Sequence, residues 1–269
     1  MFNKVLFFLK ISFAVPSAGH GTYAVVRRNL KIFSQSAWLQ TIIGLFEPLV
    51  IWVAFGYFLG HWIPEISGIN YFAYLLPAVI ALSGTQASFY ESTLGTQNKR
   101  DGTHIYRQWS YTSLTDSEIT VGEISWAAMR GWASSAMMIF VAWITDFIAF
   151  KSLIEMCLIM ALGCYAFAAL GFWLSTKNTN NTGTIGLVQV LFILPMFLFS
   201  NTFFPLELVL PKFHAVIDVF PMANLMTLLR SSQNQRIDPQ FVFALGYLFL
   251  WSIIFTNLAT HQWSSRYRS

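Results

Sequence analysis

The sequence predicts an all-α membrane protein with six transmembrane helices, an N-terminal amphipathic interface helix and short outer re-entrant helices before the last span. Six apolar stretches support this fold, because a helix needs about 20 apolar residues to cross a hydrocarbon core about 30 Å thick. Of 269 residues, 55% are apolar and only 10% are charged, which is too little charge for an ordinary soluble domain. The distribution of basic residues gives the chain its orientation.

Most of the predicted spans are separated only by short connections. Lipid offers no hydrogen-bond partner to backbone N–H and C=O groups, so each span must be a helix that satisfies its own backbone. The six spans cover residues 38–60, 72–90, 124–150, 153–174, 185–204 and 241–260. They form one transmembrane domain, 38–269, which follows a cytoplasmic arm and interface helix in residues 1–37.

Lysine and arginine are concentrated in alternate connections. The basic residues of the N-terminal arm, the second and fourth connections and the chain end are Lys4, Lys10, Arg27, Arg28, Lys31, Lys99, Arg100, Arg107, Lys177, Arg266 and Arg268. The opposite connections hold fewer, and residues 61–71 hold none. The positive-inside rule therefore predicts a multi-pass membrane protein with both termini in the cytoplasm.

Residues 20–38 have the pattern of an amphipathic helix. Apolar side chains, among them Tyr23 and Leu30, recur at helical spacing, whereas Arg27 and Lys31 fall on the other side. A basic helix of this kind suits the inner membrane surface, where its apolar face contacts membrane lipid. We therefore expect an interface helix before the first span.

The longest cytoplasmic connection is predicted over residues 92–123. It places Trp109 among charged residues that include Arg100 and Arg107. A large aromatic side chain among charges suits a docking surface for another protein, because buried aromatic anchors dominate many interfaces. A solvated loop with an incidental tryptophan is the alternative interpretation.

The same connection contains sequence signals for the end of one helix and for the start of the next. Residues 95–102 read as a polar break, because they combine glycines with adjacent charges. Thr115 and Glu118 have the Thr-x-x-Glu spacing of a capping box, in which each residue bonds the other's backbone N–H. We expect this box to start the helix that leads into the third span.

Prolines divide the connection after the fifth span, residues 201–240, into short apolar pieces. These prolines are Pro205, Pro211, Pro221 and Pro239. The pieces are too short to cross a membrane, yet they are too apolar for a free loop. Such segments dip into a leaflet and return only where protein or a water-filled cavity satisfies their backbone. This predicts an outer rim or gate that includes Phe204 and Leu208.

Charges within apolar spans are costly and usually face a partner or a cavity. Glu47 precedes a proline inside the first span and is the one expected to be deep. Glu91, Glu123 and Arg130 lie near span ends, where we expect them to reach water. Glu47 is therefore a candidate for gating or for the substrate path, with a structural role as the alternative.

The chain lacks the motifs of several other function classes. Its five histidines are scattered, and none has metal-ligand spacing with Cys, Asp or Glu. It has no phosphate-binding Gly-x-x-x-x-Gly-Lys-Ser/Thr loop. Its basic residues form no basic face with a nucleic-acid recognition motif, so we expect no nucleic acid partner.

The whole chain resembles the membrane subunit of a type-2 ATP-binding cassette exporter, nearest to polysaccharide and nodulation-factor (lipo-oligosaccharide) export permeases. The order of the predicted elements matches, and residues 114–119 with Gly122 and Glu123 resemble the family's stretch before the third span. The C-terminal pattern of the family is matched by Phe203, Phe204, Pro205, Pro211, Pro221, Met222 and Arg230. Asn224 departs from that pattern.

The resemblance implies a homodimeric pore that works with a separate ATP-binding cassette ATPase. ATP and Mg would be bound by that partner, and this chain would bind no cofactor and have no catalytic residue. The ATPase-coupling residues would be Arg100, Arg107, Trp109, Thr115 and Glu118. The substrate path or gate would include Glu47, Phe203, Phe204, Pro205, Leu208, Pro221 and Arg230.

The implied function is ATP-driven export of a lipid-linked saccharide, a glycolipid or another amphipathic substrate across the inner membrane. An ion-coupled secondary carrier is an alternative, and it would need membrane-embedded titratable groups and inverted internal repeats. A membrane-embedded lipid-modifying enzyme is a further alternative, and it would need acids or histidines clustered at one interface.

The basic-residue pattern predicts that Lys99 is cytoplasmic, whereas Ser67 and Lys212 face outward. Cysteines introduced at these positions should react with a membrane-impermeant reagent at 67 and 212, but not at 99. Strong labelling from outside at 99, together with none at 67, would contradict this topology.

Overall fold

The computed structural model describes residues 19–35, 37–63, 65–66, 68–109, 111–177, 193, 195–203, 218–235 and 238–267. The N-terminal arm before residue 19 and most of the fifth predicted span lie outside this part of the chain. The structural statements that follow concern the described residues.

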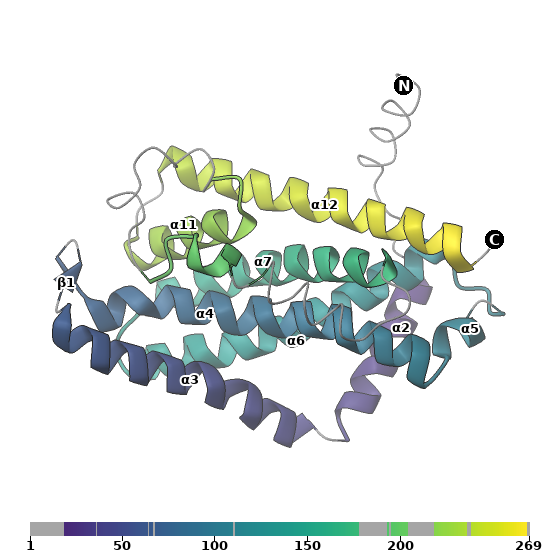
Figure 1. The fold of residues 1–269 in the computed structure, drawn as a ribbon, viewed down its shortest axis with the longest axis horizontal. Coiled ribbons are helices and arrows are strands. Elements are labelled where there is room, and N and C mark those ends of the chain that lie inside the picture. The colour runs from purple at the N-terminus through teal and green to yellow at the C-terminus, as the bar shows by residue number, and fades with distance from the viewer. Residues whose placement is uncertain are drawn as a thin grey trace.

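The structure is built from long helices that run side by side (Figure 1). They are α3 (Ala37–Trp62), α4 (Tyr71–Tyr90), α6 (Asp116–Ile144), α7 (Phe150–Lys177) and α12 (Pro239–Tyr267). Among the described residues, four helical stretches have the length and apolar character to cross a membrane: Tyr71–Gly102, Asp116–Ile144, Phe150–Lys177 and Pro239–Ser265. An additional 26-residue helix, α3, covers the first predicted span.

The helix of the second span continues well past the predicted membrane end. After α4, the chain passes through two π-helical segments, η1 (Glu91–Gly95) and η2 (Asn98–Gly102), without leaving the helical path. The predicted polar break at 95–102 is therefore wrong, because the chain turns only after Gly102. His104 has a φ of 52°, in the left-handed region, and marks the turn.

The boundary between the third and fourth spans also differs from the prediction. We expected the third span to reach residue 150, but α6 ends at Ile144. Asp146 then adopts a φ of 59°, which a continuing helix does not allow. A short turn leads to α7 at Phe150, so the two helices form a tight antiparallel pair.

The interface helix α2 (His20–Phe33) packs against the beginning of α6. Its buried residues are Val25 and Asn29, while Tyr23 and Leu30 of the predicted apolar face are exposed. A Cβ at Gly122 of α6 would lie 2.8 Å from the Val25 side chain and 3.2 Å from the Thr22 carbonyl oxygen. Gly122 therefore permits the close approach of α2, whose apolar side chains Tyr23 and Leu30 remain exposed.

The two ends of the bundle carry different elements (Figure 1). One end holds α2, the short helix α5 (Ile105–Trp109) and the C-terminal end of α12. The other end holds the hairpin of β1 (Glu65–Ile66) and β2 (Ile69–Asn70), which turns through Gly68 at φ 77° and pairs Ile66 with Ile69. This hairpin was not among the predicted elements.

Helix α11 (Pro221–Gln233) lies at the hairpin end and packs against α4, α7 and α12. Pro221 occupies its first turn, where a missing N–H costs nothing. At 13 residues α11 is too short to cross a bilayer. It is a short helix before the last span, and most of it is buried inside the protein.

The core of the bundle lies between α4, α6 and α7, where small residues allow close contact. Gly131 of α6 faces Gly84 of α4, and a Cβ at residue 131 would lie 2.3 Å from the Gly84 carbonyl oxygen. Small residues at helix interfaces are typical of membrane proteins, because close packing replaces the missing hydrophobic force.

Replacing Gly131 with Ala should therefore separate α4 from α6. We expect a loss of about 1–3 kcal/mol of stability, because the new methyl group would press on backbone atoms that cannot rotate away. Gly246→Ala in α12 is the matched control, since nothing lies within 4 Å of its Cβ position. Thermal unfolding of the purified full chain in detergent should show a lower midpoint for Gly131→Ala only; equal midpoints would reject this contact.

Candidate functional site

Charged side chains that are buried or partly buried join the π-helical extension of α4 to the first half of α6. The Lys99 ammonium in η2 lies 2.6 Å from a carboxylate oxygen of Glu123 in α6 and 3.5 Å from a carboxylate oxygen of Glu91 in η1. The Glu123 side chain is only 2% exposed. The expectation that Glu123 reaches water is therefore wrong, because α2 and η2 cover it.

The same two carboxylates bind further donors from α2 and α6. Glu91 accepts hydrogen bonds from the Trp126 indole at 2.8 Å and from the Arg130 guanidinium at 2.9 Å. Glu123 accepts a bond of 3.0 Å from the amide of Asn29, which is itself 3% exposed. We call these residues the ion network: Asn29, Glu91, Lys99, Glu123, Trp126 and Arg130.

The ion network balances two carboxylates with two cations. Buried charges are tolerated only when they are paired and hydrogen-bonded, and here each carboxylate has at least two donors. The network ties α2, the extension of α4, and α6 together near one end of the bundle. If one of these three elements moves, it must either break bonds of the ion network or move the other two elements with it.

The predicted coupling residues lie at this same end, but their environments differ. Arg100 donates to its neighbour Asp101 and to the carbonyl of Ser175 near the end of α7, and its side chain is 9% exposed. Arg107 on α5 is exposed. The Trp109 ring is half-buried, with the Tyr106 ring 5.6 Å away and the Arg28 guanidinium 5.5 Å away.

The predicted capping box is confirmed. Thr115 accepts a bond from the Glu118 N–H, and the Glu118 carboxylate accepts one from the Thr115 N–H at 3.0 Å. Glu118 also accepts a bond of 3.1 Å from the N–H of Gly21 at the start of α2. The box therefore fixes the end of the 103–115 loop and holds the start of α2 beside it.

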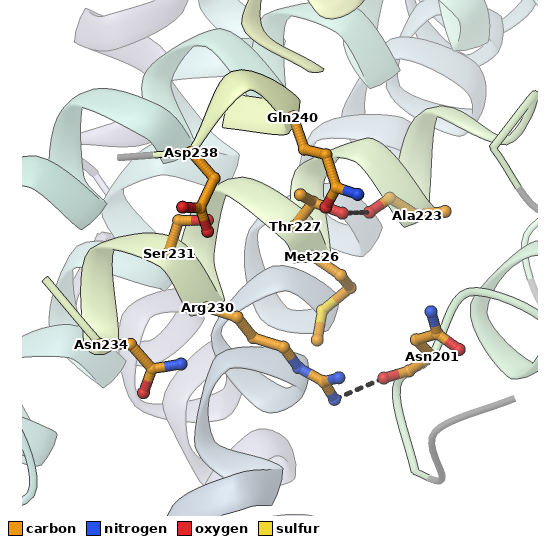
Figure 2. A pocket seen from close by; sticks show the side chains of 9 residues that line it. All are labelled: Asn201, Ala223, Met226, Thr227, Arg230, Ser231, Asn234, Asp238 and Gln240. Atoms are coloured by element: carbon orange, nitrogen blue, oxygen red, sulfur yellow. Dashed lines mark hydrogen bonds between the residues drawn. The ribbon is translucent and has the colours of Figure 1, made fainter. Parts of the chain in front are cut away.

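A polar cavity of about 230 Å³ lies at the opposite end, beside α11 (Figure 2). Its lining residues are Asn201, Ala223, Met226, Thr227, Arg230, Ser231, Asn234, Asp238 and Gln240. The Arg230 guanidinium points toward Asn201 and donates to its carbonyl. It also lies 4.1 Å from the centre of the Tyr74 ring of α4. Arg230 thus connects α11 to α4 and to the turn at residues 201–203.

The remaining predicted gate residues are only partly within the described chain. Phe203 packs edge-on against Phe197 at 5.3 Å and meets Phe55 of α3 at 5.5 Å. Phe204, Pro205 and Leu208 lie outside the described residues. Asn224, which departs from the family pattern, donates a bond of 2.7 Å to the Asp218 carbonyl and so closes the turn before α11.

Glu47 belongs neither to the ion network nor to the cavity beside Arg230. It is exposed on α3 and lines a cavity of about 120 Å³ with residues of α4 and α6, among them Ser83, Gln86 and Ser134. These hydroxyl and amide groups make the cavity polar on one wall. Glu47 therefore has a local polar environment, which fits either of the two roles predicted for it.

Comparison with known proteins identifies the family. A family profile described as ABC-2 type transporter matches residues 20–234, which is most of the chain. The chain belongs to the ABC-2 type transporter family. This confirms the resemblance inferred from the sequence and makes the protein a membrane subunit of a transporter, rather than a catalytic enzyme. Family membership also implies an ATP-binding cassette ATPase as partner.

The ABC-2 transporter subunit is also similar to curated proteins named Nodulation protein J. The protein of Rhizobium leguminosarum bv. viciae is 25% identical over 240 residues, covering 89% of this chain and 92% of the relative. That of Neorhizobium galegae is 26% identical over 241 residues, covering 90% and 92%. That of Bradyrhizobium diazoefficiens is 21% identical over 240 residues, covering 89% and 91%.

The sequence of this ABC-2 subunit pointed to the four charged members of the ion network, but not to their pairing and not to Asn29 and Trp126. Glu91, Glu123 and Arg130 were recognised as charges at span ends, and Lys99 was counted only for topology. The available signal was that acids and bases stand at matching ends of neighbouring spans. The pairing of Lys99 with Glu123 requires the helix to continue to Gly102, which the predicted break at 95–102 hid.

A double-mutant cycle measures the Lys99–Glu123 pair. Lys99→Met should cost about 3 kcal/mol or more, because it leaves a buried carboxylate without its cation. The double variant Lys99→Met with Glu123→Gln should cost less than the sum of the two single changes, since neither group is then left charged alone. Thermal unfolding of the purified chain in detergent provides the readout.

The control for this cycle is Lys151→Met. Lys151 pairs with Glu155 at 3.8 Å, but its side chain is 71% exposed, so its loss should change stability little. Additive costs for Lys99 and Glu123 would show that the buried pair contributes nothing beyond its separate side chains.

Proposed function

We propose that this chain is the transmembrane subunit of an ATP-driven exporter of the bacterial inner membrane. It would move a lipid-linked saccharide, a glycolipid or another amphipathic substrate, as a homodimer with both termini in the cytoplasm. ATP and Mg would be bound and used in the partner ATPase. Membership of the ABC-2 family and similarity to proteins named Nodulation protein J support this assignment.

The observation that carries the proposal is the connection between the 103–115 loop and the spans. Both flanks of this loop, η2 and the start of α6, belong to continuous helices that enter the bundle. Lys99 and Glu123 join these flanks 2.6 Å apart. A force applied to the loop by an ATPase would therefore reach α4 and α6 together, and α2 through Asn29 and Gly21.

The family assignment favours this function over an ion-coupled carrier. A carrier would need a titratable group in the substrate path. In the described part of the chain, the buried Glu123 and the partly buried Glu91 are instead hydrogen-bonded to cations and to Asn29 or Trp126. Their arrangement supports a structural and force-transmitting role.

Trp109→Ala should weaken binding of the partner ATPase about thirtyfold, since a desolvated aromatic anchor contributes about 2 kcal/mol or more. Arg107→Glu should cause a smaller loss that grows at low salt, as expected for a charge at an interface rim. Recovery of the ATPase with the tagged chain at low and high salt gives both effects. Arg100 is less suitable, because replacing it would also disturb the end of α7.

Tyr111→Ala is the matched control, because this aromatic residue lies in the same loop and is 82% exposed. It should leave ATPase recovery unchanged if Trp109 is the anchor. Dimer crosslinking and membrane insertion should survive in all three variants. Normal ATPase recovery with Trp109→Ala would reject the loop as the coupling element, and loss of insertion would assign Trp109 to packing against Tyr106 and Arg28.

The outer segment 201–240 is proposed as the gate of the export path. Support comes from α11, which is buried and joined through Arg230 to α4 and the 201–203 turn. Phe204→Asp combined with Leu208→Asp should impair export of the substrate and leave assembly with the ATPase intact. Export at the normal rate in this double variant would contradict the gate.

A further inference from the structure

Two cavities lie between α2, η2 and α6, and charged side chains are concentrated in one of them. The first, of about 270 Å³, is lined by Arg28, Asn98, Lys99 and Arg130 together with the apolar side chains of Ile32 and Phe33. The second, of about 190 Å³, is lined mainly by apolar side chains of α2 and α6, among them Leu30, Phe33, Met129, Trp132 and Met137. Phe33, Trp126 and Arg130 line both, so the two cavities adjoin, and we call them together the cleft.

The polar part of the cleft has an excess of positive charge. Arg28, Lys99 and Arg130 face it with a single carboxylate, Glu91, on its wall. Glu123 neutralises part of the charge of Lys99 from behind. Three cations therefore stand against two carboxylates, and the side chains of Lys99 and Arg130 retain 16% and 28% exposure. An anion with two or more oxygen acceptors would complete this arrangement.

The apolar part of the cleft continues along exposed apolar side chains. Leu30 of α2 is 47% exposed, while Met129 and Trp132 of α6 are 45% and 41% exposed. The Arg130 guanidinium lies over the Phe33 ring at 4.7 Å, where the polar and apolar parts meet. A charged head beside an apolar channel, on a helix with the pattern of an interface helix, matches the shape of a membrane lipid.

We propose that this cleft binds one anionic phospholipid, with its phosphate between Arg28 and Arg130 and an acyl chain along Leu30, Met129 and Met137. The site is distinct from the outer cavity beside Arg230 and from the cavity beside Glu47. It would make the position of α2, and through it the ion network, depend on the lipid composition of the adjacent leaflet.

The test is native mass spectrometry of the full chain in detergent, titrated with phosphatidylglycerol or phosphatidylcholine. The intact chain should bind one phosphatidylglycerol more tightly than phosphatidylcholine. Arg28→Gln should weaken phosphatidylglycerol binding about fivefold, as expected for one basic residue near an anionic lipid, and Arg28→Lys should restore it. Arg27→Gln is the charge-matched control, because Arg27 is exposed on the same helix and does not line the cleft.

A second variant tests the apolar part. Ala133→Trp should fill the channel and reduce lipid binding, whereas Ala161→Trp, at an exposed alanine of α7, should not. Equal losses with Arg27→Gln and Arg28→Gln would overturn the proposal in favour of diffuse attraction. Displacement of the lipid by inorganic phosphate would assign the cleft to a free anion. Dissociation of the dimer by Ala133→Trp, without change in lipid binding, would assign it to a second copy of the chain.

Discussion

The pairing of Lys99 with Glu91 and Glu123 is the constraint on which the inner end of the molecule depends. A carboxylate that is 2% exposed cannot remain charged in an apolar bundle without a cation beside it. The position of Lys99 therefore requires the helix of the second span to extend to Gly102 and to lie against α6. The interface helix follows, because Asn29 reaches the same carboxylate. The charges thus set the geometry of three elements that apolar packing alone would leave free to slide.

Much of the fold follows from composition and spacing. The apolar stretches predicted the long helices, the helical pattern after residue 20 predicted α2, and the Thr-x-x-Glu spacing predicted the start of α6. These features are local, so a single sequence carries them. The predicted end of the third span was wrong by several residues because only Thr145 and Asp146 interrupt an otherwise apolar run, and the left-handed conformation of Asp146 leaves little trace in hydropathy.

The features that the sequence did not reveal depend on contacts between distant residues. Glycine and charge at 95–102 look like a loop signal, yet the chain stays helical there because its charged side chains find partners in α6 and α7. Arg230 was predicted as a gate residue from a family pattern. Its contacts with Tyr74 and Asn201 join three segments that are distant in the sequence, so the pattern could not reveal them. Tertiary pairing overrides local propensity in both cases.

The π-helical turns make the number of residues between Glu91 and Lys99 structurally important. In a regular α-helix, two turns take about seven residues, yet Lys99 follows Glu91 by eight and still lies 3.5 Å from its carboxylate. The widened turn η1, which begins at Glu91, absorbs the additional residue. Deleting one residue between Glu91 and Lys99 would remove this widening and return the segment to the seven residues of two regular turns. The width of the turn and the length of the segment are therefore linked, and together they keep both charged side chains on the side of the helix that faces α6.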